Sequence, residues 1–317
     1  MATILVTGGC GFIGGHLCAA LRKRGDTVRV LDNLSSGQRG KLASGASLIE
    51  ADIRQPGVLA AALDGVDACY HLAAVASVQQ CTQDWTGSHA TNLSATIALF
   101  DAARLHSTPV VYASSAAVYG HGGDAALRER DRTMPLSAYG ADKLGCEQQA
   151  RVAGHVHGVP TTGLRFFNVF GPGQDPSSPY SGVISIICDR MRRGVPIDIF
   201  GDGSQTRDFV FVADVVTALL AAMDHASLAA PVHNICTGQS ISVLALARLV
   251  AEASGQFAEI VHRPARAGEI AHSVGSPEQA RQALGFTATT SLREGLAMTL
   301  GSNDGTLGRM LATAEAS

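Results

Sequence analysis

The 317-residue sequence is poor in aromatic and charged residues, and it has no long hydrophobic run. Aromatic residues make up 5% of the chain and charged residues 16%, and the formal net charge is -3. Acidic and basic side chains are interspersed, so the chain lacks the basic stripe of a nucleic-acid-binding protein. No segment has the length of a membrane span, and the N-terminus lacks the basic and apolar regions of a secretory signal. We expect a cytoplasmic protein with neither nucleic-acid nor membrane partners.

Cysteine is scarce as well and follows no pairing pattern. The seven cysteines include no Cys-x-x-Cys, so the sequence predicts neither a disulfide framework nor a zinc site. We expect small, buried thiols in a reducing compartment. His155 and His157 lie close together without an acidic companion at ligand spacing, and no metal site is predicted. Apolar residues, at 46% of the chain, are enough for one large core.

The first half of the chain alternates short runs of β-branched residues with longer helical stretches. This alternation is typical of βαβ crossovers onto a parallel sheet. One helix is predicted over residues 12–24, ended by Gly25, with basic residues in its last turn where the helix dipole favours them. We therefore predict an α/β fold, a Rossmann-like doubly wound parallel sheet with a smaller C-terminal α+β lobe. The candidate strands are residues 3–7, 27–31, 47–50, 68–72, 109–113 and 161–166.

A glycine-rich turn follows the first predicted strand. It satisfies G-x-G-x-x-G at Gly9, Gly11 and Gly14 and, in another register, G-x-x-G-x-x-G at Gly8, Gly11 and Gly14. Without Cβ atoms the backbone can approach a pyrophosphate closely, and the following helix N-terminus supplies N–H groups and partial positive charge. Asp32, at the end of the second strand, can accept both ribose hydroxyls of an adenosine and would repel a 2′-phosphate. These features favour NAD over NADP.

Other charged residues near this turn have two interpretations. Asp52, after the third strand, is placed to meet the adenine amino group, but it could equally cap the segment before Pro56. Arg39 and Lys41 are the nearest cations after Asp32, and we interpret them as part of a solvated loop.

The chain changes character after Asn168. Residues 171–179 form a turn-rich connector, followed by shorter and less regular elements. We predict an NAD-binding domain over residues 1–170, a second lobe over 171–300 and a loose tail over 302–317. Two returns to the main sheet are expected near residues 209–212 and 232–235.

A phenol and an ammonium lie four residues apart in the second half of the predicted domain. Tyr139 and Lys143 share one face of a helix that begins near Ser137. An adjacent cation and an oxidised nicotinamide ring together stabilise a phenolate, which can accept a proton from a sugar hydroxyl. Strand five ends in Ser114 and Ser115, at the sheet edge where ligands bind in such folds, and one of these serines can bond the reacting oxygen.

Taken together, these motifs resemble the extended short-chain dehydrogenase/reductases, specifically the UDP-hexose 4-epimerases, over roughly residues 2–300. The resemblance rests on the glycine turn, Asp32, Asn92, Ser115, the Tyr139/Lys143 pair and the segments 71–74, 164–168 and 205–209. It implies that Tyr139 is the base, that Lys143 orients the nicotinamide ribose and that Ser115 bridges to the substrate. It implies NAD contacts from Gly8, Gly11, Phe12, Ile13, Gly14, Asp32, Asn33, Asp52, Ile53, Leu72, Ala73, Ala74, Asn92, Ala113, Tyr139, Lys143 and Phe166.

The same resemblance assigns a UDP-sugar site, mainly in the second lobe. Arg207 and Arg266 can bind diphosphate oxygens in a bidentate way. Without the resemblance, we would interpret each arginine as part of a surface ion pair. Phe200 lies on an edge strand that resembles the uracil-contacting one, although a plain core strand explains it nearly as well. The full set is Ser115, Asn168, Val183, Phe200, Arg207, Arg266 and Ser273. The resemblance also implies a homodimer joined through helices near residues 92–105 and 144–153.

Two small residues favour epimerisation over other chemistry of this family. Relatives that eliminate water or decarboxylate carry an acid after the serine of strand five, whereas this chain has Ala116 and Ala117. With no acid there, a redox-neutral C4 epimerisation fits best.

Ser273 aligns where enzymes restricted to UDP-glucose and UDP-galactose carry a tyrosine, and this small residue leaves room for an N-acetyl group. We expect turnover of UDP-GlcNAc/UDP-GalNAc as well as UDP-Glc/UDP-Gal, a product that polysaccharide biosynthesis would use. Two alternatives remain: an NAD(P)H-dependent 4-epimerase or 4-ketoreductase of dTDP-6-deoxyhexoses, and a non-catalytic nucleotide-sensing module.

Overall fold

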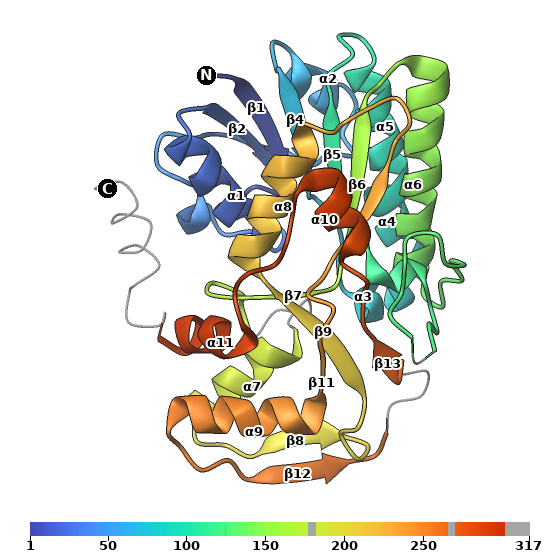
Figure 1. Ribbon diagram of the computed structural model, residues 1–317. Helices are drawn as coiled ribbons and strands as arrows, with labels where there is room; N and C mark the ends of the chain where they lie inside the picture. Colours follow the sequence, from blue (N-terminus) through green and yellow to red (C-terminus); the bar gives the residue numbers. More distant parts are fainter. Residues whose placement is uncertain (124, 177–181, 266–269, 302–317) are drawn as a thin grey trace.

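The main feature of the fold is a parallel sheet of seven strands in the order β10-β6-β5-β4-β1-β2-β3 (Figure 1). The computed structural model describes residues 1–123, 125–176, 182–265 and 270–301. All six predicted strands of the first half form, within two residues of the expected bounds, and the doubly wound α/β class is confirmed. The strands are β1 (Thr3–Thr7), β2 (Thr27–Asp32), β3 (Ser47–Glu50), β4 (Ala68–His71), β5 (Val110–Ser115), β6 (Thr161–Phe166) and β10 (Val232–Ile235).

Helices cover both faces of this sheet. On one face, α1 (Phe12–Lys23), α8 (Val212–Met223) and α10 (Glu278–Leu284) pack their apolar residues against the strands. On the other face lie α2 (Val58–Leu63), α5 (Ala95–Ala103) and α6 (Ala138–His157). Two short helices, α3 (Val78–Gln83) and α4 (Trp85–His89), follow the loop after β4. Within the described residues, no helix combines the length and apolar character that a membrane span requires.

The second lobe has its own small sheets and core. β9 (Thr206–Phe211) pairs with β7 (Asn168–Phe170), β11 (Ser240–Ser242) and β13 (His272–Ser273), while β8 (Ile197–Phe200) pairs with β12 (Ile260–Arg263). Around them lie α7 (Val183–Arg192), α9 (Val243–Ser254) and α11 (Leu292–Gly301). In this core the Phe170 ring meets the rings of Phe209 and Phe211 edge to face.

The predicted return near residues 209–212 is wrong for the main sheet, whereas the return near 232–235 is confirmed as β10. β6 is flanked by β5 and β10, so it offers no free edge to β9. β9 instead pairs in parallel with β7, Asn168 opposite Phe209, and its aromatic side chains join the core of the second lobe. The chain comes back to the first domain one element later, when α8 packs on α1.

Candidate active site

A glycine turn closes tightly between β1 and α1. Gly8 has a φ of +71°, and a Cβ on Gly14 would lie 2.1 Å from the Gly8 carbonyl oxygen, so neither position accepts a side chain without strain. Gly11 caps α1 without a side-chain hydrogen bond. The first-turn N–H groups of α1 therefore face the cavity with no side-chain acceptor at the cap, as a pyrophosphate site requires.

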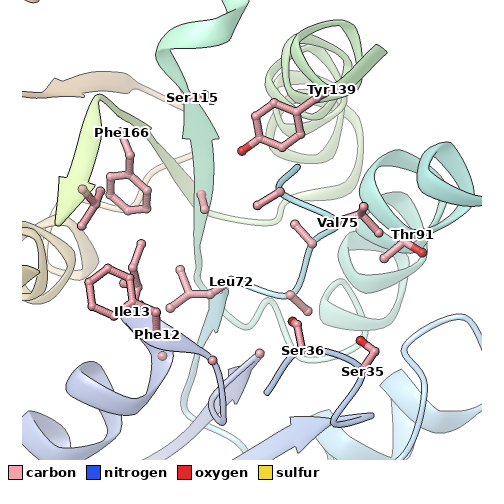
Figure 2. Close-up of a pocket in the computed structure, with 18 of the residues that line it drawn as sticks. Phe12, Ile13, Ser35, Ser36, Leu72, Val75, Thr91, Ser115, Tyr139 and Phe166 are labelled. Atoms are coloured by element: carbon pink, nitrogen blue, oxygen red, sulfur yellow. The ribbon is translucent and has the colours of Figure 1, made fainter. Parts of the chain in front are cut away.

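The carboxylate of Asp32 is held beside this turn. It accepts the backbone N–H of Cys10 at 2.9 Å and that of Leu34 at 2.8 Å, and it lines the same cavity as the glycines. Figure 2 shows Ser35 and Ser36 at the same end of the cavity. A carboxylate oxygen has two lone pairs, so both oxygens retain acceptor capacity for ribose hydroxyls.

Asp52 lies in the cavity lining and also orders the turn that follows it. It lines the cavity, and its carboxylate accepts from the Arg54 backbone N–H at 2.8 Å, which caps a turn before Pro56. Hydrogen bonds from Arg54, the largest cause, and from Asn33 lower the pKa of Asp52 to about 2. Asp52 does not cap a helix, because Gly57 is the N-cap of α2.

Tyr139 and Lys143 lie on the first turns of α6, whose N-cap is Ser137. Lys143 is buried and donates from Nζ to the Ala113 carbonyl at 2.8 Å, and this nitrogen lies 5.8 Å from the centre of the Tyr139 ring. Figure 2 shows the phenol oxygen of Tyr139 directed into the space between β5 and the loop that carries Val75. The carboxyl end of β5 thus fixes the cation, and the cation lies beside the phenol.

The structure distinguishes the two serines that end β5. Both serines line the cavity, but Ser114 is buried and donates to Glu147 Oε1 at 2.5 Å, so its hydroxyl proton is directed into the protein interior. Ser115 caps the next turn by accepting from Ala117 N at 3.2 Å and lines the cavity with Tyr139. Ser115 is therefore the serine placed to meet a ligand.

A single cavity of about 620 Å³ contains all of these groups. With the exception of Asn92, every cofactor residue predicted from the sequence lines it. Three substrate residues, Ser115, Asn168 and Val183, also line it. Phe200, Arg207 and Ser273 lie in the second lobe outside this lining, with Ser273 paired opposite Arg207 on neighbouring strands. Arg266 lies outside the described residues.

Comparison with known proteins identifies the family. The model of the NAD dependent epimerase/dehydratase family matches residues 4–236. The chain belongs to this family. Among solved structures, it is 34% identical to the UDP-glucose 4-epimerase of Thermotoga maritima with UDP-glucose, covering 96% of this chain and 99% of that one, with a TM-score of 0.91.

Two further solved structures are similar over nearly the whole chain. The UDP-N-acetylglucosamine 4-epimerase of Methanobrevibacter ruminantium, in complex with UDP-N-acetylmuramic acid, is 31% identical, covers 95% and 97% of the two chains and has a TM-score of 0.90. The UDP-glucuronic acid 4-epimerase of Bacillus cereus, in complex with UDP-glucuronic acid and NAD, is 30% identical, with coverages of 95% and 98% and a TM-score of 0.87. The predicted family, its NAD cofactor and its isomerase class are confirmed.

In this epimerase family member, a network of hydrogen bonds between buried side chains lies next to the cofactor cavity. Thr96 donates to the Asn92 carbonyl at 2.7 Å, so it accepts from His71 Nε2 at 2.9 Å, and His71 Nδ1 accepts from Thr7 at 2.7 Å. Burial, followed by the nearby Lys143, lowers the pKa of His71 to about 3. His71 is therefore neutral, and it leaves Lys143 as the charged group at this end of the cavity.

Asn92 belongs to this hydrogen-bond network and is not among the residues that line the cavity. Its side chain accepts from Val75 N at 2.8 Å and donates to Val75 O at 3.1 Å, which fixes the loop after β4. The sequence resemblance assigned Asn92 a direct cofactor contact, and the described cavity lining contains Val75 rather than Asn92.

Several other lining residues were missed by sequence reasoning. Ser35 and Ser36 had a usable signal, since they follow Asp32 directly in the same loop. Val75, Gln80 and Thr91 had none, because only the folded loop and the helices after β4 bring them to the cavity.

Proposed function

We propose that the protein is an NAD-dependent UDP-hexose 4-epimerase that oxidises C4 of the sugar transiently and returns the hydride to the opposite face. The observation that carries the proposal is the arrangement of Tyr139, Lys143 and Ser115 in one cavity with the glycine turn. The three solved structures described above, each a UDP-sugar 4-epimerase, support it.

In this mechanism, the protein residues move one proton and hold the sugar oxygen. Tyr139, beside Lys143, accepts the proton of the C4 hydroxyl and later returns it. Ser115 donates a hydrogen bond to the same oxygen and keeps it aligned. Bound NAD supplies the acceptor and donor of the C4 hydride. Between the two transfers the 4-keto sugar would turn over in the cavity, so that the hydride returns to the opposite face of C4.

Ala116 and Ala117 support epimerisation over elimination. Both follow Ser115 directly, and neither offers a proton carrier for a leaving group or a carbanion.

A decisive assay incubates the protein separately with UDP-Glc and UDP-GlcNAc, without added reductant, and resolves the products by chromatography. Interconversion of the C4 epimers supports the proposal. Stoichiometric consumption of NAD(P)H with a 4-keto sugar, and no interconversion, would favour the ketoreductase alternative.

We further propose that N-acetylated sugars are accepted because Ser273 is small. Ser273 is half-buried on β13 and pairs opposite Arg207, the proposed diphosphate ligand. Both residues lie outside the described cavity lining, and we propose that the bound UDP-sugar extends from the cavity to them. Phe200 and Arg266 complete the proposed set of UDP contacts.

Ser273→Tyr is expected to lower kcat/KM for UDP-GlcNAc by about tenfold or more, because the phenol ring fills the space of the acetamido group. Turnover of UDP-Glc should change by less than about twofold. Steady-state assays with both substrates check this, and Ser273→Ala, which preserves the space, serves as the control. Unchanged UDP-GlcNAc turnover in Ser273→Tyr would refute the gating role.

We also propose that the protein forms a homodimer in the cytoplasm. Ile97 on α5, and Val152 and Val156 on α6, are exposed apolar side chains on neighbouring helices, which supports a dimer interface there. All seven cysteines are free and buried, which fits a reducing compartment.

Replacing both Val152 and Val156 by Lys should convert the dimer to a monomer, because the change would bury lysine charges in the interface. Analytical ultracentrifugation measures this. Phe257→Lys, an equally drastic change on the second lobe, should leave association unchanged, and a persistent dimer in the double variant would place the interface elsewhere.

A further inference from the structure

Lys41 is not part of a solvated loop, contrary to the expectation from the sequence. Its side chain is half-buried, lines the cofactor cavity and donates from Nζ to the Gly173 carbonyl at 2.9 Å. Its backbone lies against the first turn of α1, since a Cβ on Gly15 would meet Lys41 O at 3.3 Å. Arg39, two residues earlier, does remain exposed and pairs with Glu50.

His16 on α1 bonds the residue before Gly173, in the described part of the turn-rich connector (residues 171–176). Its Nε2 bonds the Pro172 carbonyl at 2.9 Å, and its ring meets Phe12 edge to face at 5.8 Å. Burial lowers the pKa of His16, so the neutral ring donates its Nε2–H to this carbonyl. Two adjacent carbonyls, of Pro172 and Gly173, are therefore bound from α1 and from the loop beside it. The connector continues into Gln174 and Asp175, which line the cavity.

The cations of the described cavity lining are Lys41, Arg54 and Lys143. Arg54 is paired with Asp52 near the predicted adenine end, and Lys143 bonds Ala113 beside the catalytic phenol. A dinucleotide carries its two negative charges between these ends. The first turn of α1 has no basic side chain, so its N–H groups supply partial charge only.

We propose that Lys41 binds the diphosphate of NAD and, through Gly173, ties the bound cofactor to the connector between the two lobes. An ammonium has three N–H donors, and the bond to Gly173 uses one of them. Release of the cofactor then requires the Lys41 contact to break, which slows dissociation. Under the proposed epimerase function, where the hydride returns to the same sugar, such retention keeps the cofactor in place between the two transfers.

The test compares Lys41→Met with Arg39→Gln, a matched loss of one positive charge from the same loop. The measurements are the NAD dissociation rate and the dissociation constants of NAD and ADP-ribose by calorimetry. Loss of one charge-assisted contact should accelerate NAD release in Lys41→Met and weaken both ligands by about tenfold or more. Arg39→Gln should bind both within about twofold of the wild type.

A second variant separates folding from binding. Lys41→Gln keeps an N–H donor but loses the positive charge. Its thermal unfolding midpoint should match that of the wild type, which shows that it folds, and it should still release NAD faster. Wild-type NAD release in both folded Lys41 variants would overturn the proposal, as would weaker UDP binding with unchanged NAD binding. The outcome is independent of the epimerase proposal, since the affinities are measured without sugar turnover.

Discussion

Tyr139→Phe is expected to lower kcat for epimerisation by about 10²–10⁴-fold, the range for loss of a general acid–base group. The change removes one oxygen, which Figure 2 shows directed into the cavity, and leaves the ring that lies beside Lys143. Because Lys143 keeps its bond to Ala113, the affinity for NAD should stay within about threefold of the wild type. Product formation from UDP-Glc and UDP-GlcNAc, together with NAD titration, measures the two effects separately.

Tyr112→Phe provides the matched control. Tyr112 is fully buried on β5, outside the cavity lining, and its hydroxyl has no hydrogen-bond partner among the described residues. Losing that hydroxyl should leave kcat unchanged. If instead Tyr139→Phe retained wild-type turnover, the catalytic assignment would fail and a nucleotide-sensing role would return. If it were inactive because NAD no longer bound, Tyr139 would be a cofactor ligand and not the base.

The features that could be predicted from the sequence are those set by local rules. The glycine turn and Asp32 are fixed by the geometry of one strand-to-helix connection, and the Tyr139/Lys143 pair by the spacing of one helix. The buried strands were visible as β-branched runs bounded by turns. The structure brings these local features to one cavity: the glycine turn follows β1, Asp32 ends the neighbouring strand β2, and Lys143 on α6 bonds Ala113 on β5.

What the sequence could not predict depends on which chain segments meet. The pairing partner of β9 is decided by a free edge on β7 and by phenylalanine contacts, neither of which has a sequence signature. Lys41 looks like a surface lysine until Gly15 and Gly173 are seen beside it. Likewise, only the bond from Ser114 to Glu147 shows which serine hydroxyl is left to donate to a ligand.

That bond belongs to a buried ionic cluster behind the active site. Arg165 on β6 binds Glu147 on α6 through two hydrogen bonds of 2.8 and 2.7 Å, and both side chains are 7% exposed. Arg165 also donates to the Tyr119 hydroxyl at 2.8 Å and to the Glu129 carbonyl at 3.1 Å. The cluster ties α6, which carries the phenol and the ammonium, to β5 and β6. Ser114, bound to Glu147, immediately precedes Ser115, the proposed active-site serine.

Arg165→Met is therefore expected to destabilise the fold by about 3–5 kcal/mol, because it leaves the Glu147 carboxylate buried without its countercharge. Thermal and urea unfolding measure the loss. Adding Glu147→Met should recover most of it, since the apolar pair no longer buries an unpaired charge. Arg293→Met, which breaks the exposed pair with Glu252, should have no measurable effect. If the double variant were no more stable than Arg165→Met alone, the loss would come from the hydrogen bonds to Tyr119 and Glu129 and not from the stranded charge.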